Sequence, residues 1–482
     1  MRLLVVQRLV GALVALSGVI MLPPAAISAW YADGIVSAFL DSALACAVVG
    51  GLMWLPVRRA RHELRVRDGF LVTVATWVMV CLACALPFML GPTKLPLSQA
   101  VFESVSGLTT TGVTVLVGLD RLPASLLFYR QSLCFIGGMG IVIIAVAIVP
   151  MLRIGGSQLF RAEASSGMKD TRLTPRIAGT ARALWFVYLG LNALCALSYW
   201  IAGMDPLDAI GHAFSTVATS GFSTHDASLG YFHNALVETI AMVFMTFGGV
   251  SFALHYAAWR RASAQAYFSD AELRAYFVIL MCVTVLLAAA VYAGDTTASP
   301  GNALRRALFQ AISHLTTTGY FVGDFAPWPS FAPMLLLLVP FIGACSGSTS
   351  GGLKVVRVLL LFKQGAREVQ QLIHPRGRFM VKLGGLSVSG AVLAAVTGFC
   401  TLYALSFVAM ALVLAAAGVA PADAWTAVAT CINNMGPGIA GMDGHYADLG
   451  PAAVWVLSVA MLLGRLEVFT VLVLLSGAFW RD

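Results

Sequence analysis

Apolar runs of about 20 residues recur along the whole chain, and this feature limits its fold more than any other. A run of this length crosses the hydrocarbon core of a bilayer as a helix. The charged residues amount to 11% of the 482 positions, whereas soluble domains carry about 25%. We therefore predict an all-α, polytopic membrane protein without a long soluble domain.

The basic residues gather in a few short segments between the apolar runs. For this reason the net charge of +8 is no indication of nucleic-acid binding. By the positive-inside rule, basic segments of this kind lie on the cytoplasmic side of the membrane. The four clusters fall within residues 58–67, 153–182, 260–274 and 354–382.

Four short polar segments interrupt the apolar pattern and resemble one another. Each follows a predicted spanning helix and a half-helix too short to span, and each precedes a second spanning helix. When the segments are aligned, one glycine of each falls in a shared column, at Gly112, Gly221, Gly319 and Gly436. The segments are FESVSGLTTTGVTV, FSTVATSGFSTHD, FQAISHLTTTGYFVGD and WTAVATCINNMGPGIAG.

The pattern predicts two N-terminal transmembrane helices within residues 1–57, followed by four pore repeats. The first apolar run could instead be a signal peptide cleaved after Ala29, but we expect an uncleaved helix. The first helices of the repeats are expected at about 70–90, 183–202, 276–293 and 395–418, and the second at about 125–150, 233–258, 331–362 and 453–479. The repeats themselves are predicted to span residues 68–152, 183–260, 274–364 and 390–482.

A helix–loop–helix unit that occurs four times in one orientation predicts a fourfold pseudosymmetric ion pore. Non-helical backbone at membrane depth is tolerated only where it lines a cavity or is buried in protein. Four such loops around one axis can supply carbonyl oxygens that replace the hydration shell of a potassium ion. Each half-helix also directs the negative end of its dipole toward a cation. The alternative is that the four segments are ordinary outer loops, but this does not explain why one glycine of each falls at the same aligned position.

At this point the chain resembles the Trk/Ktr superfamily of potassium transporters, and within it the TrkH-type subunits. The motifs that carry the resemblance span the whole chain: FESVSGLTTTG, LFRAE, DAIGHAFSTVA, SGFSTHDASLGYF, GSTSGGLKVVRVLLLFKQG, NNMGPG and LLGRLEVFTVLVLL. Because this chain has glycine at all four positions of the shared column, the resemblance implies potassium selectivity. The second and fourth loops depart from the TTG pattern, which leaves the strictness of selection open. The implied potassium-binding filter consists of Thr110, Thr111, Gly112, Thr219, Ser220, Gly221, Thr317, Thr318, Gly319, Asn434, Met435 and Gly436.

The stretch GACSGSTSGGLK, residues 343–354, places glycines and hydroxyls in the middle of an expected spanning helix. A phosphate-binding loop is excluded because Leu353 stands where its lysine is needed. A flexible kink remains an alternative. The resemblance implies a gate that blocks the pore, with Arg465 as a fixed charge beside it, although Arg465 could instead pair with Glu467 or lie near the interface. The implied gate residues are Gly343, Ser346, Gly347, Ser348, Thr349, Ser350, Gly351, Gly352 and Arg465.

Titratable residues elsewhere do not form a pattern of catalysis or of metal binding. We expect Glu103 to hold the first half-helix by hydrogen bonds rather than to bind ions. His212, His225 and His314 do not share the spacing of ligands on one helix face. No nucleophile lies beside a base, so no enzyme activity is expected. The resemblance implies potassium as the metal at the filter and no covalent cofactor.

The basic segment at residues 361–382 is long for a connection between helices. It could reflect the positive-inside rule alone, or it could be a docking surface. The resemblance implies a cytoplasmic, Rossmann-type, TrkA-like partner that binds NAD(H) and adenine nucleotides. It also implies a homodimer of this chain in the bacterial inner membrane.

These observations favour potassium uptake through a channel-like, gated pore. The alternative is a coupled potassium–proton or potassium–sodium symporter, because broken helices are also typical of such folds. Two features argue against it: the four repeats share one orientation, and the spanning segments contain few acidic residues for a proton relay.

Overall fold

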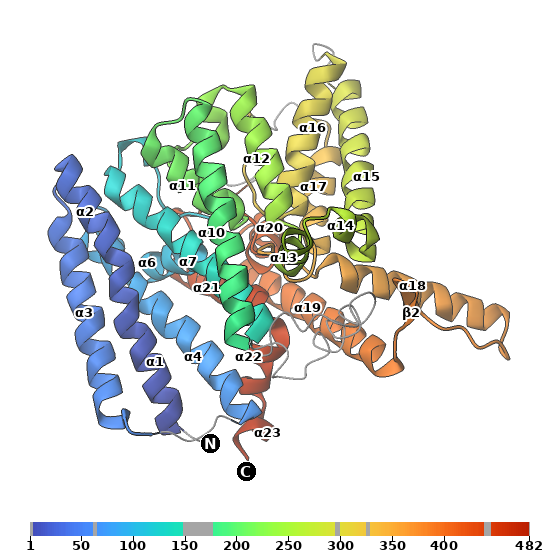
Figure 1. Ribbon diagram of the computed structural model, residues 1–482, viewed down its shortest axis with the longest axis horizontal. Coiled ribbons are helices and arrows are strands. Elements are labelled where there is room, and N and C mark those ends of the chain that lie inside the picture. The colour runs from blue at the N-terminus through green and yellow to red at the C-terminus, as the bar shows by residue number, and fades with distance from the viewer. Residues whose placement is uncertain are drawn as a thin grey trace.

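The computed structural model describes residues 3–60, 65–147, 177–294, 299–323, 328–437 and 445–481. The LFRAE motif, the basic residues of 153–176 and the Gly438 end of NNMGPG lie outside these residues. Apart from one short hairpin, the regular secondary structure is helical, which confirms the all-α prediction for the described part of the chain. Figure 1 shows the helices grouped into one body, from which one helix extends as an arm.

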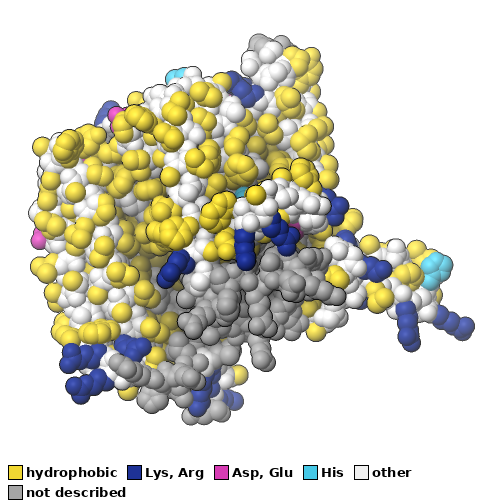
Figure 2. All heavy atoms as spheres, viewed as in Figure 1, with side chains coloured by type: hydrophobic (Ala, Val, Ile, Leu, Met, Phe, Trp, Pro, Cys, Tyr) yellow, Lys and Arg dark blue, Asp and Glu magenta, His cyan; other side chains and the backbone are white. Residues whose placement is uncertain are grey.

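Six helical segments among the described residues are long and apolar enough to cross a membrane. Two of them are the predicted N-terminal helices, and the other four are the first helices of the predicted repeats. Hydrophobic side chains cover most of the face shown in Figure 2, while Lys and Arg gather along its lower edge and on the arm. The six segments are α1–α2 (Leu3–Tyr31), α3 (Val36–Trp54) with η2 (Leu55–Val57), α4 (Val66–Cys84) with α5 (Leu86–Leu90), α10 (Ile177–Ile201), α15 (Ala271–Gly294) and α19 (Gly390–Ala416).

The N-terminal helices α1 (Leu3–Ser17) and α3 pack through small residues. A Cβ atom added at Gly50 would lie 2.3 Å from the backbone nitrogen of Ala15. One added at Gly11 would lie 2.8 Å from Cβ of Met53. Small residues let membrane helices approach closely enough for van der Waals packing.

Each repeat contains a half-helix with a proline at or just before its first turn. Proline is favoured there because the missing N–H would have no partner in the helix. A helix of 12 residues is about 18 Å long, too short for the roughly 30 Å hydrocarbon core. The C-terminal halves of these helices are buried. The half-helices are α6 (Leu97–Leu108), α11 (Pro206–Val217), α16 (Pro300–Leu315) and α20 (Pro421–Ile432).

The second helices differ from the prediction in two repeats. Residues 233–258 and 453–479 were expected to form continuous helices, and both expectations are wrong. The chain bends by 94° between α12 (Ala235–Gly248) and α13 (Phe252–Arg261). It bends by 115° between α21 (Pro451–Arg465) and α22 (Val468–Leu475). Both breaks contact the 343–354 loop, the first through backbone hydrogen bonds and the second through the side chain of Arg465. At the first break, this long-range partner replaces hydrogen bonds of the missing helical turn.

The second helix of the third repeat is interrupted where the sequence predicts. It consists of α17 (Phe331–Ile342) and α18 (Val355–Ile373), separated by the 343–354 loop. The arm in Figure 1 is α18 with the hairpin β1 (Lys382–Leu383) and β2 (Leu386–Ser387), paired antiparallel. The remaining elements are η1 (Gly18–Met21), α2 (Leu22–Tyr31), η3 (Leu119–Arg121), α7 (Ala124–Ala147), η4 (Ser228–Phe232), α14 (Gln265–Ser269) and α23 (Gly477–Trp480).

The four repeats contact one another in a closed ring. In every repeat, the second helix packs against the half-helix of the next repeat. The last contact, from the fourth repeat back to the first, closes the ring. This arrangement brings the ends of the four half-helices together. The contacts are α7 with α11, α12 with α16, α17 with α20, and α21 with α6.

Candidate functional site

The backbone has the same conformation at the end of all four half-helices. The residue two positions before the column glycine lies in the left-handed region, with φ between 50° and 56°. Its N–H donates to the carbonyl three residues earlier, and the next N–H donates to the carbonyl five residues earlier. The four residues are Thr110, Thr219, Thr317 and Asn434. The four loops therefore share one backbone structure up to the residue before the glycine. The glycines themselves differ, because φ is positive at Gly112 and Gly319, at 87° and 80°, but not at Gly221 and Gly436.

The four column glycines meet one another. A Cβ atom added at Gly112 would lie 2.1 Å from the backbone nitrogen of Gly221. One added at Gly319 would lie 2.3 Å from Cα of Gly436, and one added at Gly436 would lie 2.6 Å from Cα of Gly221. Because no heavy atom can approach that closely, only glycine fits the four places as they stand. The structure thus brings together all four predicted filter glycines.

Carbonyl groups of the filter segments are free of protein donors. In the described part of the chain, no hydrogen bond reaches the main-chain carbonyls of the predicted filter residues. Buried carbonyls are normally paired with protein or water. Unpaired carbonyls in four converging loops are ligands that hard cations prefer.

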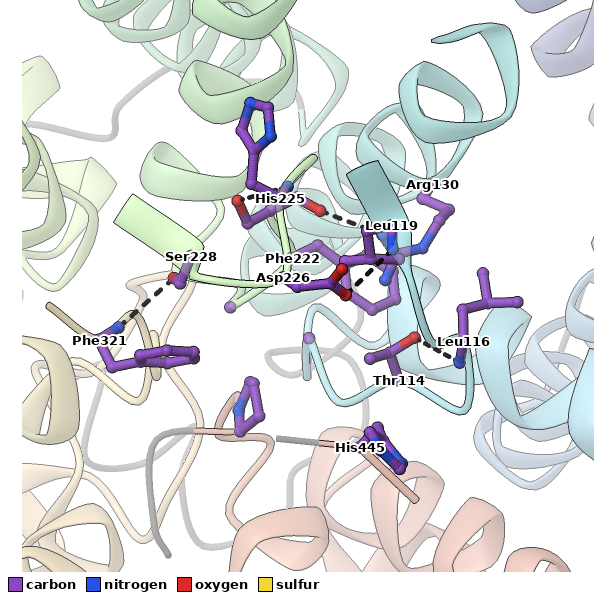
Figure 3. A pocket seen from close by; sticks show the side chains of 14 residues that line it. Thr114, Leu116, Leu119, Arg130, Phe222, His225, Asp226, Ser228, Phe321 and His445 are labelled. Carbon is purple, nitrogen blue, oxygen red and sulfur yellow. Dashed lines mark hydrogen bonds between the residues drawn. The ribbon is translucent and has the colours of Figure 1, made fainter. Parts of the chain in front are cut away.

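An open cavity of about 60 Å³ lies beside two of the column glycines, Gly112 and Gly221 (Figure 3). All four loops line it: Thr114 comes from the first, His225 from the second, Phe321 from the third and Pro437 from the fourth. Figure 3 labels Thr114, His225 and Phe321 among the residues that line the cavity, together with Arg130 and Asp226. By the positive-inside rule, this side of the loops faces outward.

The 343–354 loop also contacts the filter loops, and none of its residues lines the cavity. Thr349 and Ser350 are buried, with 0% and 1% exposure. A Cβ atom added at Gly351 would lie 1.9 Å from the carbonyl oxygen of Asn433 in the fourth loop. Gly343 and Gly352 have φ of 71° and 72°, a conformation that glycine adopts without steric cost. The loop follows a helix rather than a strand, so the phosphate-loop alternative is also wrong on structural grounds.

The break between α12 and α13 receives this loop. The N–H of Cys345 donates to the carbonyl of Gly249, and the N–H of Thr349 donates to that of Gly248, at 3.0 and 3.3 Å. In return, the N–H of Phe252 donates to the carbonyl of Gly347 at 3.1 Å. The loop therefore provides partners for backbone groups that the interrupted helix leaves free.

Arg465 lies at the end of α21 and contacts both the filter and the loop. Its Nη2 donates to the carbonyl of Thr349 at 2.9 Å and to the hydroxyl of Thr110. Glu467 pairs instead with Arg357, at 2.5 Å. The alternative of an Arg465–Glu467 pair is therefore wrong. The structure places Arg465 among the other predicted gate residues.

Charged side chains that are buried or half-buried hold the 343–354 loop. One oxygen of Glu272, in the first turn of α15, accepts from the N–H of Ser346 at 2.7 Å and from that of Val356 at 3.2 Å. The Nζ atom of Lys354 donates to the carbonyl of Ser350. Arg357 is only 7% exposed. Lys354 and Arg357, counted in a cytoplasmic basic cluster by the sequence, thus belong to the loop and its supports.

Comparison with known proteins identifies the family. The family model of TrkH, described as a cation transport protein, matches residues 35–481. The chain belongs to the TrkH family. This confirms the resemblance seen in the sequence, and it confirms that the chain is a transporter rather than an enzyme.

Relatives match this TrkH family member over its full length. The Trk system potassium uptake protein TrkH of Vibrio parahaemolyticus is 47% identical over 98% of this chain and 99% of its own. That of Halomonas elongata is 47% identical over 100% of both chains. The crystal structure of the potassium transporter TrkH from Vibrio parahaemolyticus matches with a TM-score of 0.93 and 45% identity, covering 100% of both chains.

Several positioning residues of this TrkH family chain were missed in the sequence. Ser106 and Ser313, each six residues before a column glycine, donate to the carbonyl just after that glycine, at 2.5 and 2.7 Å. In the second loop Gln131 donates to the corresponding carbonyl of Phe222 at 3.1 Å. The serine column was visible in three of the four aligned segments. Gln131 was not, because its role depends on packing between repeats.

Glu103 makes the hydrogen bonds that were expected of it. It accepts from the hydroxyl of Thr114 and from the N–H of Val115, both at 3.0 Å. It also forms a buried ion pair with Nε of Arg130 at 2.7 Å. Arg130 in turn donates to the carbonyl of Ser223 in the second loop at 3.1 Å. The pair therefore links the first two filter loops.

Replacing Glu103 by alanine is expected to destabilise the protein strongly. Removing one partner of a buried ion pair leaves the other charge uncompensated, at a cost of about 3–5 kcal/mol. The thermal unfolding midpoint of the purified chain in detergent measures the effect. Glu368→Ala on the exposed arm is the control, because exposed ion pairs contribute about 0–1 kcal/mol. Equal midpoints for the two variants would contradict the assignment.

His225 links the first two loops at the rim of the cavity. Its Nδ1 lies 2.5 Å from Asp120, and its Nε2 lies 3.2 Å from Asp208. A neutral imidazole has a single N–H, so both contacts are hydrogen bonds only in the charged form. Partial burial, the largest single effect, lowers the pKa of His225, but the bonds to the two carboxylates together raise it above 6.5.

The raised pKa predicts a stability contribution that depends on pH. For a group whose pKa is higher in the folded state, the contribution is fully present below the unfolded value near 6.5. It is lost as the pH rises through the folded value. His225→Phe, which keeps the ring stacked on Tyr231, should lower the unfolding midpoint more at about pH 6 than at about pH 9. If the unfolding midpoint of His225→Phe lay below that of the unsubstituted protein by the same amount at both pH values, the predicted role of the charged imidazole would be refuted.

Proposed function

We propose that this chain takes up potassium through a channel-like pore. The observation that carries the proposal is the meeting of four half-helices whose ends share one backbone conformation and one ring of glycines. The proposal is supported by relatives whose names describe potassium uptake. The chain is a multi-pass membrane protein, and we infer the bacterial inner membrane as its location.

The filter proposal assigns ion coordination to the four converging loops. Their unpaired carbonyls would replace water around a dehydrated potassium ion, and the half-helix dipoles would favour a cation. In the second and fourth loops, which depart from TTG, the carbonyls rather than the side chains would still supply the ligands, and the backbone matches the other two loops up to the residue before the glycine. Potassium is the transported ion and not a resident cofactor.

The gate proposal assigns closure of the pore to the 343–354 loop and Arg465. Both contact the filter loops, and both contacts involve small or polar groups that can exchange protein partners for water. Three glycines of the loop have positive φ, so its backbone can adopt conformations that other residues resist. Opening would move the loop out of the break between α12 and α13.

A coupled symporter is not favoured. Proton coupling requires titratable groups that are free to exchange protons along the pathway. Among the described residues, Glu103 is paired with Arg130, Glu272 accepts from two backbone N–H groups, and Glu467 is paired with Arg357. Asp226, which lines the cavity, accepts from the N–H of Leu119 at 3.0 Å.

We also infer that the chain forms a homodimer and binds a TrkA-like, nucleotide-binding partner on its cytoplasmic side. The arm formed by α18 supports a docking role because it exposes apolar side chains, Phe362 and Leu372, beside basic ones. Light scattering on the purified chain tests the dimer. Loss of binding of the purified partner by Phe362→Asp/Leu372→Asp tests the surface, and unchanged binding would exclude it.

Growth of a bacterial strain that lacks its own potassium uptake systems tests the function. Expression of this chain with the partner should restore growth on limiting potassium and uptake of rubidium as a tracer. Failure of both, with the protein present in the membrane fraction, would contradict potassium uptake.

A further inference from the structure

Three of the four filter loops carry threonine where threonine fits the backbone poorly. The φ angles of Thr110, Thr219 and Thr317 are 53°, 51° and 56°. A β-branched residue with positive φ is an outlier, whereas glycine and asparagine adopt this conformation readily. Such residues persist where the surroundings hold them in place. A reason for threonine at these positions must therefore come from its side chain.

Each of these hydroxyls contacts the proposed gate, either through the 343–354 loop or through Arg465. The hydroxyl of Thr317 lies 3.1 Å from that of Ser350 and accepts from the N–H of Gly351 at 2.7 Å.

The hydroxyl of Thr219 lies 3.2 Å from that of Thr349, and it also lies 2.8 Å from the carbonyl of Ala218. Thr349 in turn reaches the carbonyls of Val217 and Gly248 at 3.0 and 3.1 Å, so the Thr219 contact is the weaker one. All of these residues are buried, so these bonds form away from water.

Thr110 contacts the gate through Arg465. The guanidinium donates to the Thr110 hydroxyl and, at 2.9 Å, to the carbonyl of Thr349. A single charged group thus connects the first filter loop to the 343–354 loop. Hydrogen bonds from charged donors are stronger than those between neutral groups.

The fourth loop provides an internal comparison. Asn434 occupies the same position with φ of 50°. Its side-chain amide donates to Thr111 at 3.0 Å and to the carbonyl of Met461 at 2.8 Å, and neither partner belongs to the 343–354 loop. Asparagine, which adopts positive φ readily, stands in the one loop whose side chain at this position bonds neither to the 343–354 loop nor to Arg465. Threonine stands in the three loops whose side chain makes such a contact.

Building on the proposed pore and gate, we propose that the hydroxyls of Thr110, Thr219 and Thr317 form a latch that holds the 343–354 loop closed against the filter. The three threonines are positioning residues for the gate. Loss of a hydroxyl leaves its loop partner, such as the N–H of Gly351, unpaired only in the closed state. Since water can satisfy that partner once the loop moves, the closed state is the one that is destabilised.

The test is potassium flux into liposomes that contain only the purified chain. Thr219→Val and Thr317→Val keep the branched shape and remove the hydroxyl. Thr317→Val should raise basal flux about two- to tenfold, the range for one net hydrogen bond. Thr219→Val should raise it by less, because Thr349 keeps its carbonyl partners, and the double variant should raise it by the product. Thr317→Ser should stay near the unsubstituted level. Thr284→Val is the matched control, because its buried hydroxyl bonds within α15.

A second variant removes the partner on the loop side. Ser350→Ala leaves the filter untouched and should also raise flux, and combining it with Thr317→Val should give less than the product, as expected for two ends of one contact. If deletion of Ser346–Ser350 raises flux and the valine and alanine variants do not, the latch is wrong while the gate stands. If the deletion also has no effect, gate and latch are both wrong. Unchanged basal flux with lower potassium-over-sodium discrimination would assign the hydroxyls to ion coordination and overturn the latch.

Discussion

Replacement of Gly112 by serine is expected to reduce the discrimination of potassium over sodium roughly tenfold or more, the effect of about 1.4 kcal/mol. The new Cβ would lie 2.1 Å from the backbone nitrogen of Gly221 at a φ of 87°. The first two loops must therefore separate, and the coordination distances change with them. Relative rubidium and sodium fluxes in liposomes measure the discrimination.

A matched control, Gly118→Ser, separates the effect of the Cβ collision from the effect of placing a side chain on a residue with positive φ. Gly118 also has positive φ, at 70°, but a Cβ atom there would meet nothing within 4 Å. Gly118→Ser should therefore leave selectivity unchanged and lose only a little stability. Full discrimination in Gly112→Ser would contradict the filter assignment. Loss of discrimination in Gly118→Ser would mean that the readout reports general damage.

Deletion of Ser346–Ser350 is expected to raise basal potassium flux by at least about tenfold. It removes Thr349 and Ser350 from the filter loops, and with them the contact between Arg465 and the Thr349 carbonyl. Each net hydrogen bond contributes about 0.5–1.5 kcal/mol, so losing several removes most of the preference for the closed state. Flux is measured on the purified chain without any partner.

Selectivity provides the control for this deletion. Because the filter glycines are unchanged, the additional flux should still discriminate potassium from sodium. A non-selective leak would indicate a damaged fold rather than an open gate. A deleted protein that is folded, by size-exclusion chromatography and thermal unfolding, and that shows unchanged flux would refute the gate.

Features that recur or interrupt a periodic pattern could be predicted from the sequence. The column of Gly112, Gly221, Gly319 and Gly436 was visible because each glycine ends an otherwise helical segment in the same place. The interruption between α17 and α18 was visible because glycines and hydroxyls replace apolar residues there. Both predictions depend on local composition, which hydropathy reports directly.

Features that depend on long-range partners could not be predicted. The break at Gly248 and Gly249 lies in an apolar run, and it forms because the 343–354 loop supplies new partners for the freed carbonyls. Similarly, Glu467 was one candidate partner for Arg465 by proximity in sequence, yet it pairs with Arg357, 110 positions away. Both contacts join different repeats of the folded ring, and the order of residues in the sequence does not report which side chains meet there.

The most direct test of the central claim is the driving force for ion movement through the purified chain in liposomes. A potassium gradient, and then a sodium gradient, is imposed with and without a proton gradient. A channel-like pore predicts potassium flux that follows its own electrochemical gradient and does not respond to pH or sodium gradients. Flux that requires a proton or sodium gradient would contradict the account and would make the same four loops part of a coupled transporter.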